Sequence, residues 1–156
     1  MQLLTTLGAA VVVHSASNMS LDPNPNNVIP GVIAAAVNTL KSAYAEPSVK
    51  RFVYTSSSSA TVIAEPSQTG INVTEETWNE DSIKKAWADP PYTMERAADT
   101  YGASKAQAEQ AVWKYYKEHR DERPDLVVNT GKFSIRHMVI YLTRSSASQL
   151  QLWTIN

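Results

Sequence analysis

Three short apolar runs, with helical patterns between them, are what most constrain the fold of this chain. The runs cover residues 10–14, residues 49–54 and a stretch that begins at Leu126, and they are rich in β-branched side chains. Between them, apolar residues recur at helical spacing from Val28 to Leu40, and a second helical pattern covers about 100–119. Strand, helix, strand, helix and strand in this order predict an α/β fold with a parallel sheet and flanking helices.

Turn residues set the expected limits of these elements. Asn26 or Asn27 is expected to cap the first helix, which places Pro30 in its first turn, where proline is tolerated. The polar stretch 65–91 is expected to be a loop. Residues 139–142 are a candidate for a further strand that pairs with the sheet.

The composition argues against several classes of function. A net charge of −1 over 156 residues gives no sign of a nucleic-acid partner or an acidic membrane surface. The absence of cysteine excludes disulfides and thiol catalysis and fits a cytoplasmic protein. No uninterrupted apolar run reaches the roughly 18 residues of a membrane span, so no membrane association is expected. The three histidines, at 14, 119 and 137, have no metal-ligand spacing.

A tyrosine and a lysine four positions apart, Tyr101 and Lys105, are the first candidate catalytic pair. Four residues is about one helical turn, so both side chains lie on one face of the predicted helix. A nearby ammonium favours the phenolate form of a phenol, and such a pair can give a proton to a carbonyl oxygen or accept one from an alcohol. With seven tyrosines and eight lysines in the chain, the spacing also arises by chance, and the alternative is a solvated helix face.

A serine run supplies a second candidate group. Residues 56–59 are all serine, and they follow the second predicted strand at the carboxyl edge of the sheet, where open α/β sheets bind ligands. A serine hydroxyl there can donate a hydrogen bond to a substrate carbonyl and polarise it. The alternative is an ordinary turn, because serine is a common turn residue.

These features together resemble the extended short-chain dehydrogenases/reductases, the epimerase/dehydratase-like group. The resemblance rests on Thr-Ser-Ser after a strand, with Tyr-x-x-x-Lys 44 positions later, counted from Ser57 to Tyr101. Four further stretches match the group's pattern: VVVHSAS (11–17), PSVKRFV (47–53), EETWN (75–79) and YGASKAQAEQAVW (101–113). The fungal aldehyde and methylglyoxal reductases are the most similar subgroup, with the plant dihydroflavonol and cinnamoyl-CoA reductases nearby.

The resemblance implies roles for particular residues. Tyr101 would be the proton donor and Lys105 its activator. Ser57 would orient and polarise the substrate carbonyl, and Ser58 is the neighbouring alternative. The cofactor would be bound by the same pair on the helix and by three residues after the first strand: Ser15, Ala16 and Ser17.

The resemblance also implies a function and a cofactor. The function is reduction of aldehyde or ketone carbonyls to alcohols, with a small-molecule carbonyl compound as the substrate. The hydride would come from NADPH, with NADH as the alternative. No metal ion is expected in this chemistry.

Several parts of the family pattern are missing from this sequence. The family's first strand leads into a glycine-rich turn that holds the cofactor pyrophosphate, whereas the five glycines here lie at 8, 31, 70, 102 and 131. We therefore expect residues 1–130 to be the central part of a Rossmann-like domain, lacking the first βαβαβ half and the C-terminal substrate domain. Residues 131–156 are interpreted as an atypical tail. An intron origin is one hypothesis for it, because Gly-Lys-Phe at 131–133 can be encoded with GTAAGT.

Three hypotheses for the function stay open at this point. The chain is a carbonyl reductase; or it is a non-catalytic truncated fragment; or it is a binding or regulatory module that retains half a nucleotide cleft. Self-association through exposed sheet edges is expected if half of the sheet is missing.

Overall fold

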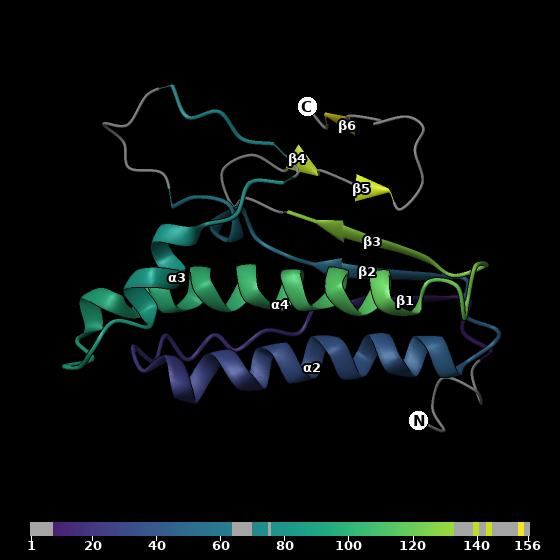
Figure 1. The fold of residues 1–156 in the computed structure, drawn as a ribbon, viewed down its shortest axis with the longest axis horizontal. Helices are drawn as coiled ribbons and strands as arrows, with labels where there is room; N and C mark the ends of the chain where they lie inside the picture. The colour runs from purple at the N-terminus through teal and green to yellow at the C-terminus, as the bar shows by residue number, and fades with distance from the viewer. Residues whose placement is uncertain are drawn as a thin grey trace.

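The computed structural model describes residues 8–63, 70–74 and 76–132, and the backbone of three short strands nearer the C-terminus. Figure 1 shows a sheet with two long helices against it. In chain order the elements are β1 (Val11–His14), α2 (Pro25–Ala45), β2 (Arg51–Thr55), the 3₁₀ turn η1 (Ser58–Ala60), α3 (Glu80–Ala86), the 3₁₀ turn η2 (Met94–Arg96), α4 (Ala97–His119), β3 (Val127–Gly131), β4 (Val139–Ile140), β5 (Thr143–Arg144) and β6 (Trp153–Thr154).

Three of the strands in the main sheet are parallel to one another. β1 pairs with β2, and β2 pairs with β3, so that the strand order is β1-β2-β3. Each crossover between neighbouring strands contains one long helix, α2 or α4, which is the usual way to connect parallel strands. The predicted α/β fold with a parallel sheet and flanking helices is therefore confirmed. β1 forms one edge of this sheet, while β5 extends the other edge in the antiparallel direction.

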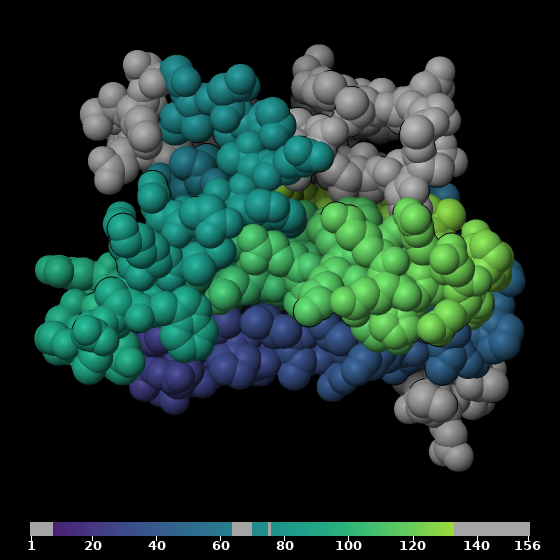
Figure 2. Space-filling view, viewed as in Figure 1, coloured from purple at the N-terminus to yellow at the C-terminus, as the bar shows by residue number. Residues whose placement is uncertain are grey.

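The helices α2 and α4 lie side by side on one face of the sheet (Figure 1). Successive strand residues point to opposite faces, so Phe52 and Tyr54 face the helices and are fully buried. They join a single core with Leu40 of α2 and Val112 of α4, all completely shielded from solvent. In Figure 2 the atoms of α4, in green, and of the segment before it, in teal, form a continuous layer directly above α2, in blue and purple. The alternate side chains of β1 point the other way, and Val11 and Val13 are 51% and 59% exposed.

The start of α2 differs from the prediction. The cap is Asn24, whose side chain accepts a hydrogen bond from the backbone N–H of Asn26, and Pro25 is the first helical residue. Proline is favoured at that position because its fixed φ suits a helix and its missing N–H has no partner there anyway. Pro30 consequently lies inside the helix, beyond the first turn, with its ring exposed to solvent.

Two other expectations also need correction. The stretch 65–91 is not all loop, because Glu80–Ala86 form helix α3 with Asn79 as its cap. The candidate strand at 139–142 does not join the main sheet: β4 pairs with β6, and it is β5 that adds to β3. Tyr141 and Leu142 lie outside the described residues.

Helix α2 is the one described helix long and apolar enough, by length and composition, to cross a membrane. Its buried residues include Val32, Ala36 and Leu40, which pack against the sheet and α4. The core helix of a packed domain passes the same test, so this feature is weak evidence for a membrane span.

Candidate active site

Lys105 lies at the centre of the candidate site. Its side chain is only 3% exposed, and its ammonium donates a hydrogen bond to the carbonyl oxygen of Thr55 at the end of β2, at 3.0 Å. The same ammonium lies 5.4 Å from the centre of the Tyr54 ring, a distance typical of a cation–π contact. The lysine is therefore fixed against the carboxyl edge of the sheet, which argues against a solvated helix face.

Tyr101 lies one helical turn before Lys105 on α4, and it is half-buried. Both residues lie in the first half of a 23-residue helix, whose N-terminal part packs on the loop after β2. The helix places the phenol and the ammonium on one face, as the four-residue spacing predicts.

The serine run adopts a defined turn next to this helix. Ser57 caps the 3₁₀ turn η1, and its hydroxyl oxygen accepts a hydrogen bond from the backbone N–H of Ser59 at 3.2 Å. Its own O–H is a donor, which is the property that the predicted role requires. Ser58 is the first residue inside η1.

Gly102 explains how the serine turn and the helix come so close. A Cβ at this position would lie 3.1 Å from the carbonyl oxygen of Ser59 and 3.3 Å from the hydroxyl oxygen of Ser82. Any side chain there would push the turn away, so the glycine permits the contact. Because Gly102 directly follows Tyr101, this contact brings the serine turn to the tyrosine's end of the helix.

Asn79 fixes the same turn from another side, a role that the sequence alone did not reveal. Its side-chain amide donates to the carbonyl oxygen of Ser59 at 2.9 Å, and its backbone N–H donates to that of Ala60 at 2.9 Å. It is 6% exposed, and it also caps α3. The Trp-Asn pair in the 75–79 stretch was a signal for this position, although the residue's partners depend on tertiary structure.

The residues after β1 approach the site from the other strand. Ser15 and Ala16 are exposed, and Ser17 is half-buried. The loop that they begin is tied to α4, because the hydroxyl of the buried Thr100 donates to the carbonyl oxygen of Pro23 at 3.0 Å. The structure thus brings this loop to the N-terminal end of α4, near Tyr101.

Several buried polar atoms at this edge have no hydrogen-bond partner within the described part of the chain. They are the hydroxyls of Ser17 and Ser56 and the Nε2 atom of His14. They follow or end two adjacent parallel strands, β1 and β2. Because buried polar groups in folded proteins are normally satisfied, this cluster fits a polar ligand at the carboxyl edge of the sheet.

The site's electrostatics centre on the buried lysine. Burial lowers the pKa of the Lys105 ammonium, and the negative charge of Glu109 acts in the opposite direction. Burial, and then the charge of Lys105, lower the pKa of the His14 imidazole. Burial raises the pKa of the Tyr54 phenol well above its ordinary value, so that this phenol stays neutral at neutral pH.

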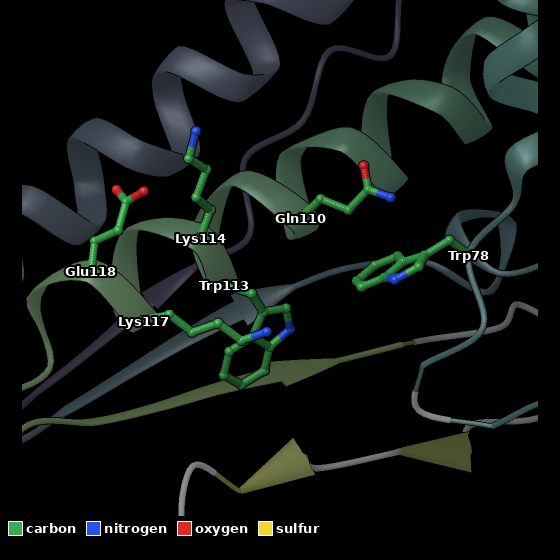
Figure 3. A pocket seen from close by; sticks show the side chains of 6 residues that line it. All are labelled: Trp78, Gln110, Trp113, Lys114, Lys117 and Glu118. Atoms are coloured by element: carbon green, nitrogen blue, oxygen red, sulfur yellow. The ribbon is translucent and has the colours of Figure 1, made fainter.

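A cavity of about 400 Å³ lies away from these residues. As Figure 3 shows, its lining comes mainly from one side of α4, with a single residue from the segment before α3. The lining residues are Trp78, Gln110, Trp113, Lys114, Lys117 and Glu118. None of the predicted catalytic residues lines it, so we do not place the chemistry there. Among the described residues, no group of three or more His, Asp or Glu side chains could hold a metal ion; His137 lies outside them.

Comparison with known proteins identifies the family of this chain. A family profile described as Male sterility protein, an NAD-binding family, matches residues 2–156. The chain belongs to this family. The resemblance to the epimerase/dehydratase-like short-chain reductases is confirmed.

Two of the curated relatives show the degree of similarity. NAD-dependent epimerase/dehydratase terH of Aspergillus terreus is 42% identical over 119 residues, which are 76% of this chain and 34% of that protein. Aldehyde reductase 2 of Sporidiobolus salmonicolor is 41% identical over 113 residues, 72% of this chain and 33% of that protein. The chain spans about a third of the length of these relatives.

Among solved structures, Gre2 of Candida albicans in complex with NADPH is similar, with a TM-score of 0.65 and 25% identity. The match covers 84% of this chain and 38% of that one. The chain thus shares its family and fold with proteins that are named as an NAD-dependent epimerase/dehydratase and as reductases.

Proposed function

We propose that this chain carries the catalytic part of an NADPH-dependent oxidoreductase that reduces aldehyde or ketone carbonyls to alcohols. The observation that carries the proposal is the buried ammonium of Lys105, bound to the carbonyl of Thr55 and one turn from Tyr101. Burying a lysine ammonium costs free energy. Buried ionisable groups with shifted pKa values are common at sites where a side chain transfers a proton.

The residues present fit a nicotinamide cofactor. The buried hydroxyls of Ser17 and Ser56 are unpartnered within the described chain and lie after adjacent strands, where this class of sheet binds dinucleotides. Ser15, Ala16 and Ser17 would hold the cofactor from the β1 side, and Lys105 and Tyr101 from the α4 side. The NADPH bound in the related Candida albicans structure supports NADPH over NADH as the cofactor. When bound, the cofactor supplies the hydride.

The chain's own residues then have separate tasks. The Ser57 hydroxyl, fixed by the N–H of Ser59, donates a hydrogen bond to the substrate carbonyl oxygen and orients it. Tyr101 gives its phenolic proton to that oxygen as it becomes an alcohol. The Lys105 ammonium stabilises the phenolate that remains on Tyr101.

Cofactor binding is the first test of this proposal. The purified 156-residue chain is titrated with NADPH and with NADH while its melting temperature is followed. A cofactor at 100 times its Kd stabilises a competent fold by about 2.7 kcal/mol, which gives a clear and saturable shift. Absence of any shift would contradict the proposal for this chain and favour a non-catalytic fragment.

Turnover is the second test, with two tyrosine variants on the same helix. Tyr101→Phe removes the proposed proton donor and is expected to lower carbonyl reduction by about 100-fold or more. Tyr116→Phe removes a phenol that is also half-buried and lies about four helical turns away. It is the control, and its rate of carbonyl reduction is expected to equal that of the unmodified chain. Equal activity of the two variants would exclude Tyr101 as the donor.

A further inference from the structure

Glu109 is a buried acid that the proposed chemistry does not yet use. It lies on α4, four residues after Lys105 and eight after Tyr101, so the three side chains share one face of the helix. It is only 1% exposed. A carboxylate is expensive to bury unless hydrogen bonds or an opposite charge compensate it, so its presence in this core calls for a physical reason.

One oxygen of this carboxylate is held by the sheet. The hydroxyl of Thr130, in β3, donates to Glu109 Oε1 at 2.8 Å, and Thr130 is itself 1% exposed. The other oxygen, Oε2, is buried with no hydrogen-bond partner in the described part of the chain. The hydrogen bond from Thr130 therefore fixes the carboxylate, but it compensates the burial of only one of the two oxygens. A nearby positive charge is needed to offset the remaining cost of burying the carboxylate.

Lys105 is the matching buried cation. Its two contacts, the Thr55 carbonyl and the Tyr54 ring, are neutral groups. Burial lowers the pKa of Lys105, and the charge of Glu109 is the influence that raises it. Among the described residues, no carboxylate oxygen lies within 4.0 Å of the Lys105 ammonium, so Lys105 has no direct ion pair there. Glu109 therefore acts on Lys105 by electrostatic attraction across one helical turn.

In the described part of the chain, the other titratable groups that interact with the pair, or that lie on or after the strands beside it, supply no negative charge at neutral pH. His14, on β1, is a neutral or positive group, and the charge of Lys105 helps to lower its pKa. Tyr54, on β2, has a pKa raised by burial and then by the charge of Glu109. Lys132, after β3, is a cation that donates to the carbonyl oxygen of Thr77 at 3.3 Å and lies over the Trp78 ring. From α2, the neutral hydroxyl of Thr39 contacts His14.

We propose that Glu109 is a positioning residue that, fixed by Thr130, keeps Lys105 as a buried ammonium beside Tyr101. The proposal rests on the function proposed above, in which that ammonium stabilises the phenolate. Glu109 touches neither substrate nor cofactor in this scheme and acts only through Lys105.

The test measures the ionisation of Lys105 directly, so that it does not depend on turnover. The chain is labelled with ¹³C at the lysine ε-carbon, the Lys105 signal is assigned with Lys105→Arg, and the signal is followed as the pH is raised. Glu109→Gln keeps the shape and the acceptor for Thr130 but loses the charge, and the titration midpoint of Lys105 is expected to fall by about one unit. Glu118→Gln, an exposed acid on the same helix, is the control and should leave the midpoint unchanged. An unchanged midpoint in Glu109→Gln would overturn the proposal.

A rescue experiment covers the case in which Glu109→Gln does not fold. Removing the carboxylate leaves Lys105 as an uncompensated buried cation, and replacing that lysine as well removes the cost. The double variant Glu109→Gln/Lys105→Met is therefore expected to melt at a higher temperature than Glu109→Gln alone, and this gain should exceed the effect of Lys105→Met in the unmodified chain. If Glu109 only anchored Thr130, Lys105→Met would change the melting temperature equally in the two backgrounds, and that result would overturn the proposal. Because neither readout uses catalysis, a failed turnover assay remains distinguishable from a failure of this inference.

Discussion

The ammonium of Lys105 and the carbonyl oxygen of Thr55 are 3.0 Å apart, although the two residues are 50 positions apart in the chain. This hydrogen bond ties the first half of α4 to the last residue of β2. Since Tyr101 lies one turn earlier on α4 and the serine turn directly follows β2, the bond fixes the two halves of the candidate site relative to each other.

The first prediction concerns this lysine. Lys105→Met fills similar space but removes the ammonium, so carbonyl reduction is expected to fall by about 100-fold or more, because the phenolate on Tyr101 loses its stabilising charge. Steady-state kcat/KM, with circular dichroism to check the fold, measures the effect. Lys114→Met removes an exposed lysine of the same helix and should cost nothing. Similar losses in the two variants would show that the charge of Lys105 has no special role.

The second prediction compares two helical glycines. Gly31 is exposed in α2, and a Cβ there meets nothing within 4 Å, so Gly31→Ala is expected to raise the free energy of unfolding by roughly 0.5–1 kcal/mol. At Gly102 the same change gains the same helix propensity but places a Cβ 3.1 Å from the Ser59 carbonyl oxygen. Because that oxygen belongs to the backbone, we expect Gly102→Ala to give no net stabilisation and to displace the serine turn.

Denaturant unfolding of both glycine variants checks this contrast, and the reductase assay follows the turn. Gly102→Ala is expected to lose activity while Gly31→Ala keeps it. An equal gain of stability in the two variants, with full activity in both, would mean that the turn moves away at no cost.

The three parallel strands and the two long helices could be predicted because their signals are local. Apolar periodicity placed the strands within about two residues of their observed limits, and the four-residue spacing placed Tyr101 and Lys105 on one face of α4. The start of α2 was wrong by a few residues, since the run Asn-Pro-Asn-Asn at 24–27 offers several capping residues. Pro25 resolves the choice, because proline suits the first helical position.

Helix α3 was missed although its ends carry a recognisable pattern. Asn79 is a capping residue, acidic Glu80 and Asp81 occupy the first turn, and basic Lys84 and Lys85 occupy the last, which complements the helix dipole. Seven residues are too few for apolar periodicity to be visible. Attention to capping and charge would have found this helix.

Other parts of the site could not be predicted from the sequence, because they depend on contacts between distant segments. The hydrogen bond from Thr130 to Glu109 and that from Asn79 to the Ser59 carbonyl join residues about 20 positions apart through the fold. On the sequence, Glu109 is one more polar residue of an alanine-rich helix. Only its burial in the structure distinguishes it.

The third prediction concerns His14 and pH. The imidazole is 7% exposed and stacks on the Tyr54 ring, and its pKa in the folded chain lies below the ordinary 6.5. The unfolded chain therefore binds a proton at this residue more readily than the folded chain does. Its contribution to stability is present above pH 6.5 and is lost as the pH falls from about 6.5 toward the lower folded value.

Thermal melts of the chain between about pH 7 and pH 5 measure this dependence. His14→Phe keeps an aromatic ring against Tyr54 but cannot take up a proton, so it is expected to flatten the loss of stability on acidification. The idea fails if His14→Phe and the unmodified chain lose stability in parallel.

The fourth prediction concerns Arg123, which joins the ends of three segments. Its guanidinium donates to the carbonyl oxygens of Tyr44 at 2.7 Å and Val49 at 2.8 Å, and to Asp125 Oδ1 at 2.9 Å. The two carbonyls lie at the end of α2 and just before β2, so the one side chain closes the turn between these elements. Arg123→Ala leaves both acceptors without this donor and is expected to lower the free energy of unfolding by about 2 kcal/mol.

Denaturant unfolding of Arg123→Ala and of Arg120→Ala separates this role from a general effect of charge. Arg120 is exposed at the end of α4, and its replacement should change the free energy of unfolding by less than about 0.5 kcal/mol. Arg123→Lys keeps the charge but has a single ammonium in place of the planar fork, so it should recover only part of the lost stability. If Arg123→Lys is as stable as the unmodified chain, the positive charge is enough to hold this turn closed, and the several hydrogen bonds of the guanidinium are not needed.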